Sequence, residues 1–130
     1  MTNKSWALNA LGRHQEALDA SDQAINLKKS APAYTNRGWA LHALKHYSQA
    51  LQAHEKALAI DPHFAPAYKG KGDDLFALGD VDQALAAYDS ALLLDPGFAP
   101  AYKGKGDVLQ KQGRFQEAKL AYERARQLER

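Results

Sequence analysis

Two identical glycine-rich segments are the first candidates for chemistry in this chain. The segment FAPAYKGKGD occupies residues 64–73 and recurs, letter for letter, at residues 98–107. Glycines around a lysine can hold a phosphate when they form the loop between a strand and a helix. A dinucleotide-binding loop also needs a third glycine, and that position holds Leu75 in one copy and Leu109 in the other. The pattern therefore does not favour a phosphate site.

A metal site is the second candidate. His42 and His46 are four residues apart, a spacing at which two side chains on a helix can chelate a metal ion. A third ligand is not evident, because His14, His54 and His63 fall at other positions of the pattern. The chain has no cysteine and no readable Ser–His–Asp arrangement. We predict no metal, no cofactor and no enzymatic activity.

Composition narrows the classes of partner. The 130-residue chain has 45% hydrophobic and 25% charged residues and a formal net charge of +2, as is typical of a globular domain. Its lysines and arginines are scattered among acids, so nucleic acid is not an expected partner. No segment is apolar over a length that suits a signal sequence or a membrane span. We expect one soluble, cytoplasmic domain over residues 1–130 that does not bind membranes.

The two glycine-rich segments are units of a longer repeat. They begin at residues 64 and 98, which are 34 residues apart, and matching residues recur at that interval elsewhere in the chain. A shorter copy precedes them, because residues 3–12 match residues 36–45. Self-similarity at such a period predicts a solenoid of stacked units. The repeated positions are Tyr34, Tyr68 and Tyr102; Gly38, Gly72 and Gly106; Ala50, Ala84 and Ala118; and Ala57, Ala91 and Ala125.

Each unit reads as two helices joined by a turn. The first helix begins near Pro66 and ends at Gly79, a typical residue after a helix C-terminus. Asp82 is predicted to cap the second helix, which ends before Pro96 because a residue that precedes proline avoids the α region. No segment alternates as a strand does. The sequence therefore predicts an all-α fold in which the glycine-rich segments lie inside helices.

Small residues mark where helices approach closely. Gly38, Gly72 and Gly106 share a position, and the repeated alanines of the second helix are its predicted partners. Gly70 and Gly104 share a position with an asparagine, Asn36 in the second unit, so we predict that larger residues are tolerated there. A glycine in a helix costs about 1 kcal/mol relative to alanine.

The pattern resembles the tetratricopeptide repeat. That family is recognised here by Tyr68, Gly72, Leu75, Gly79, Ala84, Tyr88, Ala91 and Pro96, with equivalents in the other units. The resemblance implies a right-handed superhelix of about four units, at residues 1–30, 31–64, 65–98 and 99–130. The first helices would line a concave groove and the second helices the outer wall. Lys45 stands where a turn glycine is usual, so this turn is either strained by a lysine at positive φ or differently shaped.

The resemblance also implies a function. The chain would be a protein-interaction module, a scaffold or adaptor, whose concave groove binds a peptide or helix of a partner protein. Ligands in this family meet positions three or four apart on one face of the first helices. Those positions hold Trp and Asn in the first half of the chain and mainly Lys and Asp in the second. The predicted ligand-binding residues are Asn3, Trp6, Asn36, Trp39, His42, Lys69, Asp73, Phe76, Lys103 and Asp107.

Other interpretations of these residues stay open. The two tryptophans could pack against neighbouring helices, and Lys69–Asp73 and Lys103–Asp107 could form ion pairs within their own helices.

The last unit suggests a second function from a different class. It has Lys119 and Arg126 where inner units have leucine, which predicts a polar cap. Leu120 and Tyr122 would leave apolar surface beside them. The alternative is a structural array or fragment that self-associates weakly, end to end, through its terminal repeats.

Overall fold

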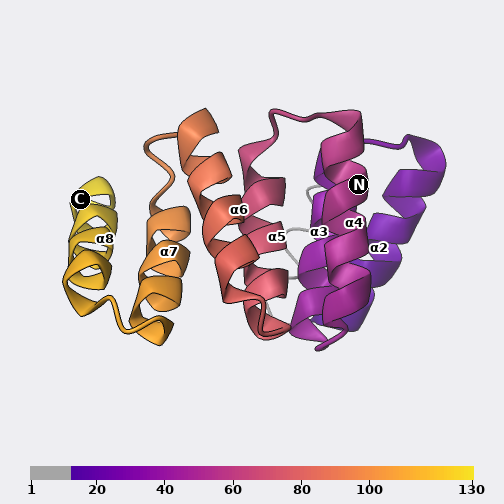
Figure 1. Cartoon of the computed structure of the whole chain (residues 1–130). Helices are drawn as coiled ribbons and strands as arrows, with labels where there is room; N and C mark the ends of the chain where they lie inside the picture. Colours follow the sequence, from indigo (N-terminus) through magenta and orange to yellow (C-terminus); the bar gives the residue numbers. More distant parts are fainter. Residues whose placement is uncertain (1–12) are drawn as a thin grey trace.

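The structure is a computed structural model that describes residues 13–130, and within that range it is entirely helical, as the sequence predicts. The helices stand side by side in chain order (Figure 1). Their bounds are α2 His14–Leu27, α3 Ala31–Ala43, α4 Tyr47–Ile60, α5 Ala65–Ala77, α6 Val81–Leu94, α7 Ala99–Lys111 and α8 Phe115–Leu128.

The contacts between helices curve the array. Each described helix packs against the next one in the chain. In addition α3 contacts α5 and α5 contacts α7, whereas α4 does not contact α6 and α6 does not contact α8. The first helices of successive units are therefore closer together than the second helices. The face lined by α3, α5 and α7 is the inner, concave side of this part of the chain.

Proline and the residues before it set the helix boundaries. Helices α3, α5 and α7 have proline in the first turn, where the missing N–H has no intrahelical partner to lose. Helices α4 and α6 end at Ile60 and Leu94, and the residue that follows each of them, Asp61 or Asp95, precedes a proline. These boundaries confirm the helix–turn–helix pattern.

The N-terminal cap of α6 differs from the prediction. The Asp80 side chain accepts a hydrogen bond from the backbone N–H of Gln83 at 3.3 Å. Asp82, predicted as the cap, lies within the first turn of the helix. That prediction was wrong because the helix begins at Val81, and a capping oxygen must come from the residue before the first helical one.

The turns inside the units use positive φ angles. Gly79 and Gly113 have φ of 88° and 79°, and Lys45 has φ of 66° at the equivalent turn. The lysine keeps the turn although a side chain in the left-handed region costs about 1–2 kcal/mol. Of the two alternatives for this turn, the structure has the lysine at positive φ.

None of the helices formed by residues 13–130 combines the length and the apolar character that crossing a bilayer requires.

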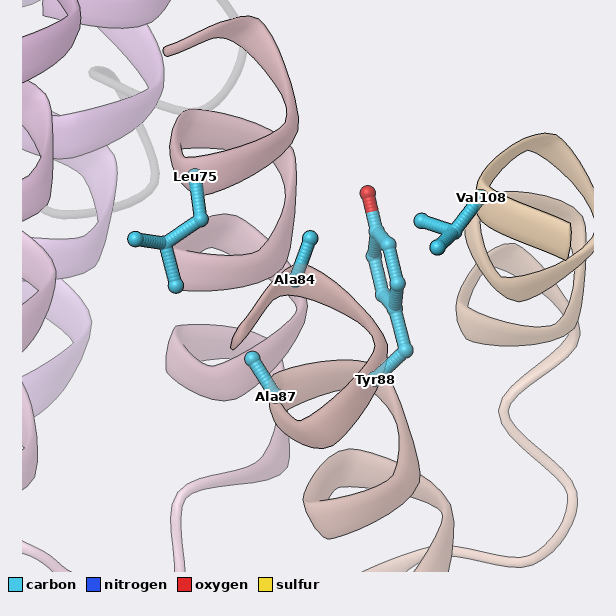
Figure 2. Close-up of a cluster of buried hydrophobic side chains, with 5 residues drawn as sticks. All are labelled: Leu75, Ala84, Ala87, Tyr88 and Val108. Carbon is cyan, nitrogen blue, oxygen red and sulfur yellow. The ribbon is translucent and has the colours of Figure 1, made fainter. Parts of the chain in front are cut away.

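The core consists mainly of alanines, together with leucine, valine and tyrosine side chains, in several clusters along the array. One cluster joins α5, α6 and α7 through Leu75, Ala84, Ala87, Tyr88 and Val108. Figure 2 shows the Tyr88 ring rising from α6 with Val108 of α7 pointing toward it. Alanines let the helix backbones approach, and an aromatic ring fills the space that remains.

Candidate interaction groove

The second helices carry a ring between their two repeated alanines. His54, Tyr88 and Tyr122 occupy this position in α4, α6 and α8, and Ser21 occupies it in α2. The three rings set the packing of the first helices. They also determine which polar groups reach the concave face.

Each inner ring lies between two glycines of adjacent units. A Cβ added at Gly38 or at Gly70 would come closer than 3.0 Å to the His54 ring. A Cβ at Gly72 would lie 2.7 Å from Tyr88 Cε1, and one at Gly104 would approach the same ring just as closely. The rings are thus clamped between the first helix of their own unit and that of the next.

Two predictions about these glycines were wrong. Gly70 and Gly104 were expected to tolerate larger residues, but each contacts the ring of the preceding unit. The atoms nearest to a Cβ at Gly38, Gly72 or Gly106 belong to the rings and not to the repeated alanines. The sequence carries a signal for this contact, an exchange of side-chain size between a second helix and the first helix of the next unit. Where the second helix has the small Ser21, the next unit has Asn36. Where it has the ring of His54 or Tyr88, the next unit has a glycine, Gly70 or Gly104.

The tyrosine hydroxyls explain the two halves of the groove. Tyr88 Oη donates a hydrogen bond to Asp73, and Tyr122 Oη donates one to Asp107 Oδ1 at 2.5 Å. The equivalent of these aspartates in the second unit is Trp39, which is half-buried and belongs to a unit whose ring is the shorter His54. In the units whose ring is a tyrosine, this position holds an aspartate that accepts from the hydroxyl. In the unit whose ring is His54, which has no hydroxyl, the same position holds Trp39.

Both phenols are harder to ionise than an ordinary tyrosine. Burial, and then the negative charge of Asp73, raise the pKa of Tyr88 far above its usual value. Burial, and then the hydrogen bond to Asp107, raise the pKa of Tyr122 to about 12 from 10.0. In each case the folded chain favours the neutral phenol.

We expect ionisation of the Tyr122 phenol to lower the stability of the folded chain at alkaline pH. Its folded pKa lies above the unfolded value, so its contribution is complete below pH 10.0 and is lost as the pH rises through about 12. Tyrosinate absorbance of the folded protein should show one fewer late-titrating phenol in the Tyr122→Phe variant. If the absorbance lost in Tyr122→Phe came from the phenols that titrate near pH 10, burial and the Asp107 hydrogen bond would not hold this phenol neutral.

A buried polar cluster ties three helices together. Asp74 of α5 is 0% exposed, and its two carboxylate oxygens lie 2.8 Å from Nδ1 of His42 and 2.6 Å from Nδ1 of His54. The His42 ring is 35% exposed and meets Tyr47 edge-on at a centroid distance of 5.0 Å. Nε2 of His54 is buried without a hydrogen-bond partner. The cluster fixes His42 from α3, so this groove residue is anchored by a side chain that sequence reasoning missed.

This cluster is not arranged as a metal site. Within residues 13–130, no group of three or more His, Asp or Glu side chains could hold a metal ion. The imidazole nitrogens that face Asp74 are engaged with its carboxylate.

The structure separates the predicted site residues into different environments. Asn3 and Trp6 lie outside the described residues. Asn36 is only 4% exposed, so its side chain is buried in the described structure. Lys69 pairs with Asp73 at 2.6 Å, as the spacing allowed, but Lys103 pairs with Glu129 at 2.7 Å and not with Asp107.

Two predicted residues meet at an open cavity of about 510 Å³ that α5, α7 and α8 line at the C-terminal end of the array. Phe76 comes from α5 and Asp107 from α7, and the rest of the lining comes from α7 and α8. The sequence did not single out Phe115 or Tyr122 for ligand contacts because both lie on a second helix, α8, and Lys111 lies at the end of α7, outside the selected positions. The lining residues are Phe76, Asp107, Gln110, Lys111, Phe115 and Tyr122.

Solved structures share this arrangement of helices. The thermophilic TPR protein TTC0263 of Thermus thermophilus matches with a TM-score of 0.92 at 23% identity, over 98% of this chain and 72% of that one. A MamA crystal structure matches with a TM-score of 0.79 at 26% identity, over 96% of this chain and 74% of that one. The first TPR domain of human RPAP3 matches with a TM-score of 0.81 at 23% identity, over 88% of this chain and 91% of that one.

Sequence comparison leads to the same family. No curated protein is significantly similar in sequence. Two sequence models described as tetratricopeptide repeat match, one over residues 31–64 and the other over residues 69–129. These ranges include the glycines, rings and alanines that pack the helix pairs, and so the chain belongs to the tetratricopeptide repeat family.

Proposed function

We propose that the concave face of α3, α5 and α7 binds a segment of a partner protein. Repeats of this family generally serve as non-enzymatic protein-interaction scaffolds, and the residues exposed on the scaffold select the partner. The observation that carries the proposal is the open cavity of about 510 Å³, where three aromatic side chains lie beside charged groups of α7. Aromatic residues with a polar rim are typical of anchor sites at protein interfaces.

The exposure of Phe115 supports an anchor role. Its side chain is 66% exposed although it lines the cavity, so its apolar surface has little cover from the described residues. Lys69 and Asp73, by contrast, are already paired with each other on the same face. The cavity end of the groove is therefore the preferred place for the first contact with a partner.

A selection experiment tests the proposal. Peptides selected from a random library on the purified chain should lose at least tenfold in affinity when Phe115 is replaced by alanine. A matched control is Leu93→Ala on α6, because Leu93 is 84% exposed and does not line the cavity. Recovery of no binding peptide would contradict the function, and equal losses in both variants would contradict the site.

A second candidate, weak self-association, is favoured by one observation. Leu120 of α8 is 65% exposed and lies outside the lining of the cavity. Sedimentation at several concentrations should then show a reversible dimer that Leu120→Lys weakens. A strict monomer at all concentrations would exclude this candidate and leave the groove proposal untouched.

A further inference from the structure

We propose that the cavity lined by Phe76, Asp107 and Tyr122 receives an arginine side chain of the partner segment. The inference rests on the proposed function, because it names the chemistry of the residue that enters the groove. It depends on the different environments of two equivalent aspartates and on the walls around one of them.

Asp107 lacks the internal cation that its equivalent has. Asp73 accepts from the Tyr88 hydroxyl and also pairs with Lys69 at 2.6 Å. Asp107 accepts from the Tyr122 hydroxyl at 2.5 Å, but the lysine equivalent to Lys69 pairs with Glu129 instead. No Lys, Arg or His among residues 13–130 forms an ion pair with Asp107. Its charge is therefore available to a cation from outside.

The walls suit a guanidinium group. Phe76 of α5 and Phe115 and Tyr122 of α8 line the same cavity as Asp107. A guanidinium is planar and weakly hydrated, and it stacks on aromatic faces while it donates two parallel hydrogen bonds to a carboxylate. Gln110 adds an amide oxygen at the same place, 3.3 Å from the Tyr122 hydroxyl. A lysine ammonium, a strongly hydrated point charge, uses these flat walls less well.

Lys111 is the internal competitor. It lines the cavity four residues after Asp107 on the same helix, although it forms no ion pair with that carboxylate. Its flexible side chain would repel an incoming cation and partly neutralise Asp107. Its removal should therefore strengthen binding of a cation, whereas it would have no such effect on a purely apolar ligand.

Nuclear magnetic resonance with a small probe tests the inference. Acetyl-arginine amide, added to the ¹⁵N-labelled chain, should shift the amide signals of the cavity residues in a saturable manner. Acetyl-lysine amide should bind several-fold more weakly, and acetyl-citrulline amide, which has the same shape without the charge, should cause no saturable shift. Equal responses to the arginine and citrulline probes would overturn the inference.

Three variants assign the effect to this cavity. Asp107→Asn should abolish the response, whereas Asp89→Asn, a change on α6 outside the cavity lining, should leave it intact. Lys111→Gln should strengthen binding of acetyl-arginine amide at least twofold. An unchanged response in Asp107→Asn would overturn the assignment. Retention of the wild-type amide spectrum outside the cavity would establish that each variant is folded.

The outcomes also separate this inference from the proposed function. If selected peptides bind the groove but do not need an arginine, the inference fails and the function stands. If acetyl-arginine amide binds as expected but no peptide is selected, the function fails while the cation site remains.

Discussion

Gly104→Ala is expected to lower the free energy of unfolding by about 1–3 kcal/mol. On helix propensity alone the change should stabilise the chain by about 1 kcal/mol. The added methyl group, however, would come closer than 3.0 Å to the Tyr88 ring, and Gly72 borders that ring on its other side. Either α7 must move away from α6 or the buried ring must leave its position.

Urea denaturation of the variant measures this effect. Gly97→Ala is the matched control, because the nearest atom to its new Cβ would be an Asp95 carboxylate oxygen at 3.8 Å. The control should leave the denaturation midpoint nearly unchanged. An equal midpoint shift in both variants would contradict the steric explanation.

The size exchange between units offers a sharper form of the same experiment. Between α2 and α3 the small Ser21 is combined with Asn36, whereas between α6 and α7 the large Tyr88 is combined with Gly104. The double variant Tyr88→Ser, Gly104→Asn should be destabilised by less than the sum of its single variants. Contacting residues typically couple by about 0.5–3 kcal/mol. Strict additivity would mean that the ring and the glycine do not constrain each other.

Asp74→Ala is expected to have a larger effect than Gly104→Ala, about 3–5 kcal/mol of destabilisation. Asp74 is 0% exposed and is the acceptor for two imidazoles from two other helices. Nε2 of the buried His54 has no hydrogen-bond partner, so Asp74 is the partner of the other ring nitrogen, Nδ1. Removal of the carboxylate would leave both nitrogens of this buried ring unpaired. A domain with a total stability of about 5–15 kcal/mol would lose much of it.

The control for this prediction is Asp89→Ala. Asp89 is a half-exposed residue of α6 that pairs with Lys105 at 2.8 Å. An exposed ion pair contributes about 0–1 kcal/mol, so the control should differ little from the wild-type chain. Thermal and urea denaturation of both variants would measure the loss of unfolding free energy in each. Similar losses would show that the buried cluster contributes no more than a surface pair.

The helices and turns of this chain were predictable because their causes are local. Pro66, Gly79 and Pro96 act on their own backbone or on that of an adjacent residue, and the repeated alanines report a helical face. Even Lys45 at positive φ followed from comparison with the glycines of the other turns. The exception was the N-terminal cap of α6, where Asp80 and Asp82 are two residues apart and the prediction chose the wrong one.

The candidate site was predictable only in part. Helical spacing correctly paired Lys69 with Asp73, but the same spacing failed for Lys103, because Glu129 near the end of α8 competes for it. His42 was selected as a groove residue, yet its anchor Asp74 was not, since the two are 32 residues apart. Phe76 and Asp107 were selected separately, and the cavity that joins them needed residues from α8.

Sequence by itself determined that the chain repeats a pair of helices and belongs to the tetratricopeptide repeat family, because period and turn residues act within one unit. Only the tertiary structure decided which side chains meet between units. Gly104 was restricted by a ring 16 residues before it, and Asp74 was placed between histidines of two other helices. Such contacts depend on how closely and at what angle neighbouring helices pack, and no residue encodes that distance alone.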